Sequence, residues 1–187
     1  GGVGKSTSTL HIASCLARSS QTLAIDGDMN ASLLDWEARG QGFPFTVVHK
    51  ESAAKTAGKY EYVVIDTPAR PEPKQLKAIA EGCDRLIVAT AVDGVSMAAL
   101  RPAIEDLKAL KAEYSVLLTL VPPTGNAGLF ARQALEAQGV PVMKASIRRY
   151  AAYQRAGLSG SLVWDVSDEN ALIAGGDYEQ LTAELLG

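Results

Sequence analysis

The sequence predicts an α/β fold in which helices cover both faces of a doubly wound, mostly parallel β-sheet. Two observations predict this class. Short apolar runs alternate with segments of helical spacing along the chain. A glycine-rich loop leads directly into the first helical segment, and it reads Gly1-Gly2-Val3-Gly4-Lys5-Ser6-Thr7. The composition is typical of such a domain, since 47% of the residues are hydrophobic and only 6% are aromatic.

Each element follows from its local pattern. Helical spacing of apolar residues predicts helices at 5–18, 33–36, 74–81, 96–111, 127–138 and 171–186, with a short helix or turn at 52–59. Apolar runs predict strands at 22–26, 45–49, 60–66, 85–90, 115–121 and 140–145. We expect a single domain over residues 1–187, with its first strand and the start of the glycine-rich loop lying ahead of Gly1.

The glycine-rich loop has the residues that phosphate binding requires. Its three glycines allow the backbone to turn tightly with N–H groups directed at phosphate oxygens, where a Cβ would obstruct a nucleotide. We expect Lys5 to reach the β- and γ-phosphates, Ser6 to bind Mg²⁺ and Thr7 to hydrogen-bond the α-phosphate, beside the positive end of a helix. The alternative is a glycine-rich turn that caps a helix without a ligand.

Acidic residues follow two of the predicted strands. Asp26 ends one strand, with Asp28 two residues later, and Asp66 ends another strand in the form of a Walker B motif. Ligands of open α/β sheets lie at the carboxyl ends of the strands, where an aspartate can hold a water bound to Mg²⁺. A helix cap is the alternative for Asp26 and Asp28, and an ordinary strand-to-helix connection is the alternative after Asp66.

One stretch of the chain has a local excess of basic residues. Residues 137–164 contain no acid but include Lys144, Arg148, Arg149 and Arg155. The chain as a whole has a net charge of −3 and is therefore not basic. Nucleic-acid binding would depend on this local segment or on an oligomer. A solvated strand end and helix face is the alternative.

The two cysteines do not indicate a metal site. Cys15 and Cys83 have neither CxxC spacing nor a histidine nearby at the spacing of metal ligands, since His11 and His49 are the only histidines. We expect free thiols in a reducing cytoplasm. No apolar run approaches the length that a membrane span needs.

Taken together, these motifs resemble the ParA/MinD superfamily of deviant Walker ATPases over the whole chain. That family has a phosphate loop of the form KGGVGKT or KGGVGKS, a D-x-D after its second strand and a D-T-P after its Walker B strand. The matching segments here are Gly1 to Ser6, Asp26-Gly27-Asp28 and Asp66-Thr67-Pro68. The stretch from Ser146 to Gly157 is also similar to the I-R…A…G segment of ParA proteins, and the chain looks most like small ParA proteins, including the McdA-like group.

The resemblance implies an ATPase that binds Mg·ATP, forms a homodimer across the nucleotide and hydrolyses ATP when a ParB-like or McdB-like partner stimulates it. It would partition plasmid or chromosomal DNA, or position a protein cargo, on the nucleoid in the cytoplasm and without a membrane contact. The implied catalytic residues are Lys5 and Asp28, the metal residues are Ser6, Asp66 and Asp26, and the residues that bind DNA without sequence preference are Arg148, Arg149, Arg155 and Lys144.

Other enzyme classes share this loop and fold. An enzyme of the dethiobiotin synthetase type, which would transfer phosphoryl to a small carboxylate, is the alternative function. An iron–sulfur reductase similar to the nitrogenase iron protein needs a cysteine just after the Walker B strand, and residues 66–73 contain none. The superfamily's signature lysine would directly precede Gly1. Thr119 stands where many relatives have an asparagine near the adenine, so the residues that contact the base stay open.

Overall fold

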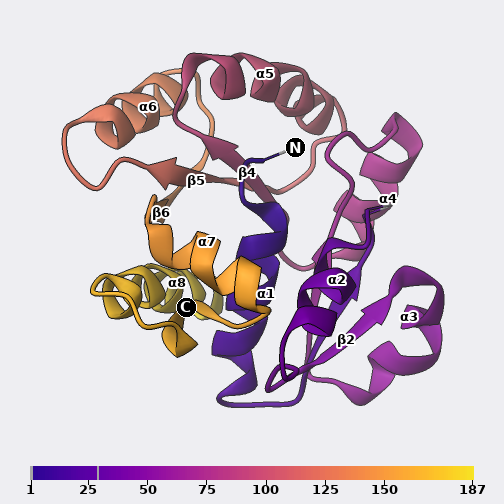
Figure 1. The fold of residues 1–187 in the computed structure, drawn as a ribbon. Coiled ribbons are helices and arrows are strands. Elements are labelled where there is room, and N and C mark those ends of the chain that lie inside the picture. The colour runs from indigo at the N-terminus through magenta and orange to yellow at the C-terminus, as the bar shows by residue number, and fades with distance from the viewer. Residues whose placement is uncertain (1, 29) are drawn as a thin grey trace. The chain divides into compact units, whose positions relative to one another are not determined.

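The computed structural model describes residues 2–28 and 30–187 (Figure 1). The chain divides into two compact units, and each is described by itself. The first unit comprises Gly1–Gly4, Arg70–Arg149 and Gly187, and the second comprises Lys5–Ala69 and Tyr150–Leu186.

The second unit has a parallel sheet of three strands in the order β2-β1-β3. Strand β1 (Thr22–Asp26) lies between β2 (Thr46–His49) and β3 (Tyr62–Asp66), and every residue of β1 is buried. The register pairs Asp26 with Asp66. Two of the three acids expected at the site therefore lie side by side at the carboxyl edge of this sheet.

Helices from both ends of the chain pack in this unit. Helix α1 packs on β1 and β3, and α8 packs on α1, as the indigo and yellow ribbons of Figure 1 show. The helices are α1 (Lys5–Ala17), α2 (Ser32–Arg39), α3 (Lys50–Thr56), α7 (Ala151–Ser159) and α8 (Ala171–Leu186), with short 3₁₀ turns η1 (Ala57–Lys59) and η2 (Val163–Asp165). The core includes Leu10, Ala24 and Leu33, which are fully buried.

The first unit has a second parallel sheet of three strands, in the order β4-β5-β6. Its strands are β4 (Ile87–Ala91), β5 (Ser115–Val121) and β6 (Val142–Arg148), and its helices are α4 (Pro73–Gly82), α5 (Gly94–Ala109) and α6 (Ala127–Glu136). Apolar side chains of α5, β5 and α6, such as Ile104, Leu118 and Leu135, form one buried cluster. All described strand pairs of both units are parallel, which confirms the predicted fold class.

The sequence reasoning missed helix α7, which lies within the acid-free stretch. Its buried residues are Ala152 and Ala156, one turn apart. Because two alanines make a weak apolar stripe, the periodic pattern that predicts a helix is faint here. The helix ends at Gly160, whose φ of 68° is the left-handed conformation that favours glycine after a helix. Strand β6 also extends to Arg148, three residues beyond its predicted end.

A close approach of two backbones joins α2 to α7. A Cβ at Gly40 would lie 1.9 Å from the carbonyl oxygen of Gly160, so no larger residue fits there. The indole N–H of Trp36 donates to the carbonyl of Ser161 at 2.9 Å, and the Arg39 guanidinium donates to the carbonyl of Gly157 at 3.1 Å. The residues after α2 and α7 are therefore held in direct contact.

A histidine lies fully buried at the centre of an aromatic cluster in the second unit. The Val163 N–H donates to Nε2 of His11 at 3.1 Å, so the ring proton is on Nδ1, which donates to the Thr7 carbonyl at 2.7 Å. The ring stacks on Tyr178 with centroids 4.8 Å apart, and Tyr153 meets it edge-on. Burial lowers the pKa of His11 to about 4, so the ring is neutral at pH 7.

We expect the buried His11 to make the fold less stable in mild acid. The unfolded histidine binds a proton below a pH of about 6.5, but the folded one binds it only below about 4, so the unfolded state holds more protons in this range and is favoured as pH falls. This effect should lower the free energy of unfolding by about 3 kcal/mol between pH 7 and pH 4. Urea unfolding of the wild type and of His11→Gln across this range measures it. Parallel stability curves for the two proteins would contradict the prediction.

Candidate nucleotide site

The glycine-rich loop has the backbone that a phosphate loop needs. Gly2 has a φ of 95° and Gly4 a φ of 77°, both in the left-handed region that glycine adopts without strain. Helix α1 begins directly afterwards, at Lys5. The positive end of a helix of 13 residues and the charge of Lys5 therefore meet at the same place in the chain. Gly1, the first predicted phosphate-binding residue, lies outside the described residues.

The expected metal-binding pair is in direct contact within the second unit. The Ser6 hydroxyl donates to Oδ2 of Asp66 at 2.5 Å, across 60 residues of sequence. Asp66 is 1% exposed, and among the described residues its other oxygen, Oδ1, has no hydrogen-bond partner. A buried carboxylate oxygen without a partner is unusual unless an ion or water completes it. This donor set, a hydroxyl beside a carboxylate, fits the oxygen ligands and bound waters of Mg²⁺.

The surroundings of Asp66 act on its charge in opposite directions. Burial is the largest effect and raises the pKa of Asp66, because the ionised form loses water contacts. The hydrogen bond from Ser6 and the charge of Lys5 favour ionisation, whereas the charges of Asp26 and Asp28 oppose it. A divalent cation at this position would offset the mutual repulsion of the three carboxylates.

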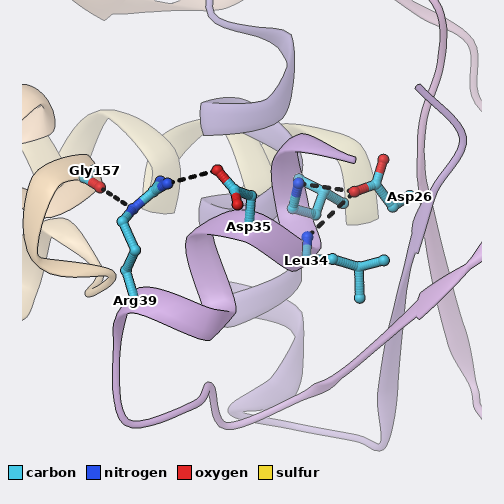
Figure 2. Close-up of polar contacts among 6 residues, drawn as sticks. Asp26, Leu34, Asp35, Arg39 and Gly157 are labelled. Carbon is cyan, nitrogen blue, oxygen red and sulfur yellow. Dashed lines mark hydrogen bonds and ion pairs between the residues drawn. The ribbon is translucent and has the colours of Figure 1, made fainter. Parts of the chain in front are cut away.

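Asp26 serves as a cap for helix α2. Its Oδ2 accepts hydrogen bonds from the backbone N–H groups of Leu33 at 2.9 Å and Leu34 at 3.2 Å, and Oδ1 accepts one from Asp28 at 3.3 Å. Figure 2 shows the bonds from the first turn of α2 to this carboxylate. The structure thus shows the helix-cap role that the sequence left open. A supporting role of Asp26 beside the metal stays a prediction.

Gly27 lies directly against the last residue of strand β3. Its N–H donates to the Asp66 carbonyl at 2.9 Å, and a Cβ at this position would lie 2.5 Å from the same oxygen. Asp28 follows with a partly exposed side chain, whose Oδ1 accepts a hydrogen bond from the Asn30 N–H at 3.0 Å. The role of Asp28 in positioning a water molecule, which would use its other oxygen, stays a prediction.

The residues predicted to bind DNA lie in both units. Lys144, Arg148 and Arg149 belong to the first unit, where the first two lie on β6 and the Arg149 N–H donates to the Val121 carbonyl at 2.8 Å. Arg155 belongs to α7 in the second unit.

Arg155 has partners that the sequence pattern did not indicate. Its guanidinium donates to the Ser167 carbonyl at 3.0 Å and lies 3.3 Å from the Asp168 carboxylate, which is largely buried. The acid-free stretch of sequence is therefore not acid-free in space, because the fold brings Asp168 back to Arg155. Part of the positive charge expected for DNA is balanced at this residue.

Thr119 lies under the glycine-rich loop. Its hydroxyl lies 2.8 Å from the carbonyl oxygen of Val3 and 3.0 Å from that of Thr90. The sequence did not indicate this contact with the loop, since Thr119 was compared there only with the asparagine that many relatives have near the adenine. A hydroxyl in the middle of the apolar run 115–121 was the signal that could have indicated it.

Residues 1–163 match the family described as CbiA: CobQ/CobB/MinD/ParA nucleotide binding domain. The chain belongs to this family. It is 31% identical over 193 residues to "Maintenance of carboxysome distribution protein A" of Gloeobacter kilaueensis, a match that covers 99% of this chain and 89% of that protein. A protein of the same name from Halothiobacillus neapolitanus is 21% identical over 180 residues, covering 89% and 83%.

Solved structures of this family have the same fold. The MinD cell division protein of Aquifex aeolicus has a TM-score of 0.77 at 18% identity, covering 100% of this chain and 93% of that one. The Cyanothece McdA(D38A)-ATP complex has a TM-score of 0.72 at 14% identity, covering 99% and 92%. These comparisons confirm the α/β fold and the resemblance to ParA/MinD proteins.

Membership of the CobQ/CobB/MinD/ParA family makes the chain a nucleotide-binding protein of the ParA/MinD ATPase class. Within the described part of the chain, no helix has the length and apolar character that crossing a membrane requires.

We expect Asp66→Asn to weaken binding of Mg·ATP about tenfold, because the amide keeps the contact with Ser6 but removes the negative charge. Affinity for ATP in EDTA should be unchanged or tighter, since one charge that repels the phosphates is gone. Calorimetric titrations with and without Mg²⁺ measure both. Asp35→Asn, an equal change at an exposed carboxylate paired with Arg39, is the control. Equal losses with and without Mg²⁺ would count against a metal role.

Proposed function

We propose that this protein is a ParA-type ATPase that binds Mg·ATP, forms a homodimer across the nucleotide and hydrolyses ATP when a partner protein stimulates it. The observation that supports this best is the hydrogen bond between Ser6 and the buried Asp66, next to the lysine that begins α1. Family membership supports nucleotide binding. The contacts of the described residues support a division of roles among the polar groups.

Each polar group of the site has a distinct proposed role. Lys5 and the loop N–H groups stabilise negative charge on the phosphates. Ser6 and Asp66 hold Mg²⁺, which when bound neutralises charge on the β- and γ-phosphates. Asp28 orients the attacking water through its partly exposed carboxylate. Asp26 fixes the start of α2 and adds negative charge behind the metal.

We further propose that the cargo is a protein assembly rather than a plasmid. Two relatives carry the name "Maintenance of carboxysome distribution protein A", and one matches nearly all of this chain. In the proposed cycle the ATP-bound dimer binds nucleoid DNA in the cytoplasm without sequence preference, and an McdB-like or ParB-like partner on the cargo triggers hydrolysis and release. The basic residues Lys144, Arg148, Arg149 and Arg155 make the phosphate contacts.

We expect Asp28→Ala to bind Mg·ATP and dimerise normally but to lose at least a hundredfold in single-turnover hydrolysis, because a group that orients water acts mainly in the transition state. Lys5→Ala should instead abolish nucleotide binding. Quenched-flow hydrolysis and calorimetry separate the two variants. A loss of Mg·ATP affinity in Asp28→Ala would reassign Asp28 to the metal or to the fold. Unchanged affinity in Lys5→Ala would overturn the site itself.

We also expect DNA binding to depend on nucleotide and salt. Dimerisation doubles the number of contacted phosphates, so the ATP form should bind duplex DNA more tightly than the ADP form and with a steeper salt dependence. The double variant Arg148→Ala, Arg149→Ala should weaken binding of all DNA sequences similarly. Lys74→Ala, Lys77→Ala removes the same charge from α4 and is the control. Equal affinity in all nucleotide states, or equal losses in both double variants, would favour a small-molecule enzyme instead.

A further inference from the structure

Thr119 is a buried polar residue in the central strand of the first unit. It is the fifth residue of β5 and is 1% exposed, and the preceding Leu117 and Leu118 are buried apolar residues. Burying a hydroxyl costs free energy unless it is hydrogen-bonded. Valine would fit this apolar strand equally well without that cost. A threonine here therefore indicates that its hydroxyl makes a specific hydrogen bond.

The hydroxyl of Thr119 connects the strand to the glycine-rich loop. Its nearest acceptor is the carbonyl oxygen of Val3, at 2.8 Å, across 116 residues of sequence. The Thr90 carbonyl on the neighbouring strand β4 is a second acceptor at 3.0 Å. A hydroxyl has a single hydrogen, so the two carbonyl oxygens either share this hydrogen or accept it in turn. Either arrangement holds the Thr119 side chain in one orientation.

The contact with Val3 also determines where the next N–H group points. The described peptide bonds are trans, and in a trans peptide the carbonyl of one residue and the N–H of the next point in opposite directions. Because the Val3 carbonyl points at Thr119, the Gly4 N–H points away from β5. Gly4 lies near this side chain, since a Cβ at Gly4 would lie 3.9 Å from the Cβ of Thr119, at ordinary van der Waals distance.

This orientation is the one that anion binding requires. A phosphate loop presents N–H groups to the anion, and a carbonyl turned toward it would repel the phosphate oxygens. We infer that Thr119 is a positioning residue for the phosphate loop. Its hydroxyl holds the Val3 carbonyl toward β5 and away from the anion, and thereby presents the Gly4 N–H to the nucleotide. This inference rests on the proposed nucleotide site and adds to it a residue from β5 that does not itself touch the phosphates.

The test compares variants that differ in one hydroxyl. Thr119→Val keeps the shape but removes the donor, and Thr119→Ser keeps the donor. Thr90→Val is the matched control, since it removes a buried hydroxyl from the adjacent strand that donates to the Ala91 carbonyl and not to the loop. Calorimetric titration with Mg·ATP and Mg·ADP gives the affinities, and thermal unfolding gives the stability of each variant.

We expect Thr119→Val to bind both nucleotides about tenfold more weakly, with Thr119→Ser and Thr90→Val within about twofold of the wild type. In amide NMR spectra, the Gly4 signal of Thr119→Val should respond less to added ADP. Wild-type affinity in Thr119→Val, or an equal loss in Thr90→Val, would overturn the inference. If Thr119→Val does not fold, Thr119→Ala against Thr119→Ser gives the same comparison.

The outcomes also separate this inference from the proposed function. If the wild type binds no nucleotide, or if Lys5→Ala binds as well as the wild type, the nucleotide site itself is wrong. If nucleotide binding depends on Lys5 but not on the Thr119 hydroxyl, the site is correct and only the role of Thr119 is wrong.

Discussion

The hydrogen bond between Ser6 and Asp66 is the contact on which the candidate site depends. It joins the first turn of α1 to the last residue of β3, and so places the start of the helix at the carboxyl end of the strand. A hydrogen bond to a charged group contributes about 1.5–3 kcal/mol, which does not offset the full cost of burying a carboxylate. The partnerless Oδ1 of Asp66 shows that this cost is not fully met by the described residues. A site with such a deficit gains stability when a cation binds.

The position of α1 relies in turn on the last helices of the chain. The Thr7 carbonyl, one residue after Ser6, accepts a hydrogen bond from His11, which is also bound to the Val163 N–H. The hydroxyls of Ser8 and Tyr178 lie 3.1 Å apart. The first turns of α1 are therefore fixed by contacts that span more than 150 residues of sequence. Changes in the aromatic cluster around His11 should therefore be felt at Ser6 through the backbone of this helix.

The features that could be predicted from the sequence are those that depend on neighbouring residues. The glycines, Lys5 and Ser6 form one continuous motif, and an apolar run that ends in aspartate specifies both a strand and the edge where the acid lies. The missed features depend on distant residues. Helix α7 buries alanines against other elements, Arg155 meets Asp168, and the Thr119 hydroxyl meets Val3. No local pattern predicts these pairs, because the two partners lie far apart in sequence and meet only in the folded chain.

Asp26 and Asp66 show how the fold separates two residues that look alike in the sequence. Each is the buried last residue of a strand, and the register places them directly opposite one another. Oδ2 of Asp26 accepts two backbone N–H groups at the positive end of α2, which ties its charge to the helix, and Oδ1 accepts the N–H of Asp28. Asp66 has one hydroxyl partner, and its other oxygen has no partner in the part of the chain that the structure describes. Since a carboxylate already bound to three N–H groups has less capacity left for a cation, the hydrogen bonds around the two acids, and not the sequence motif, make Asp66 the better candidate for the proposed metal.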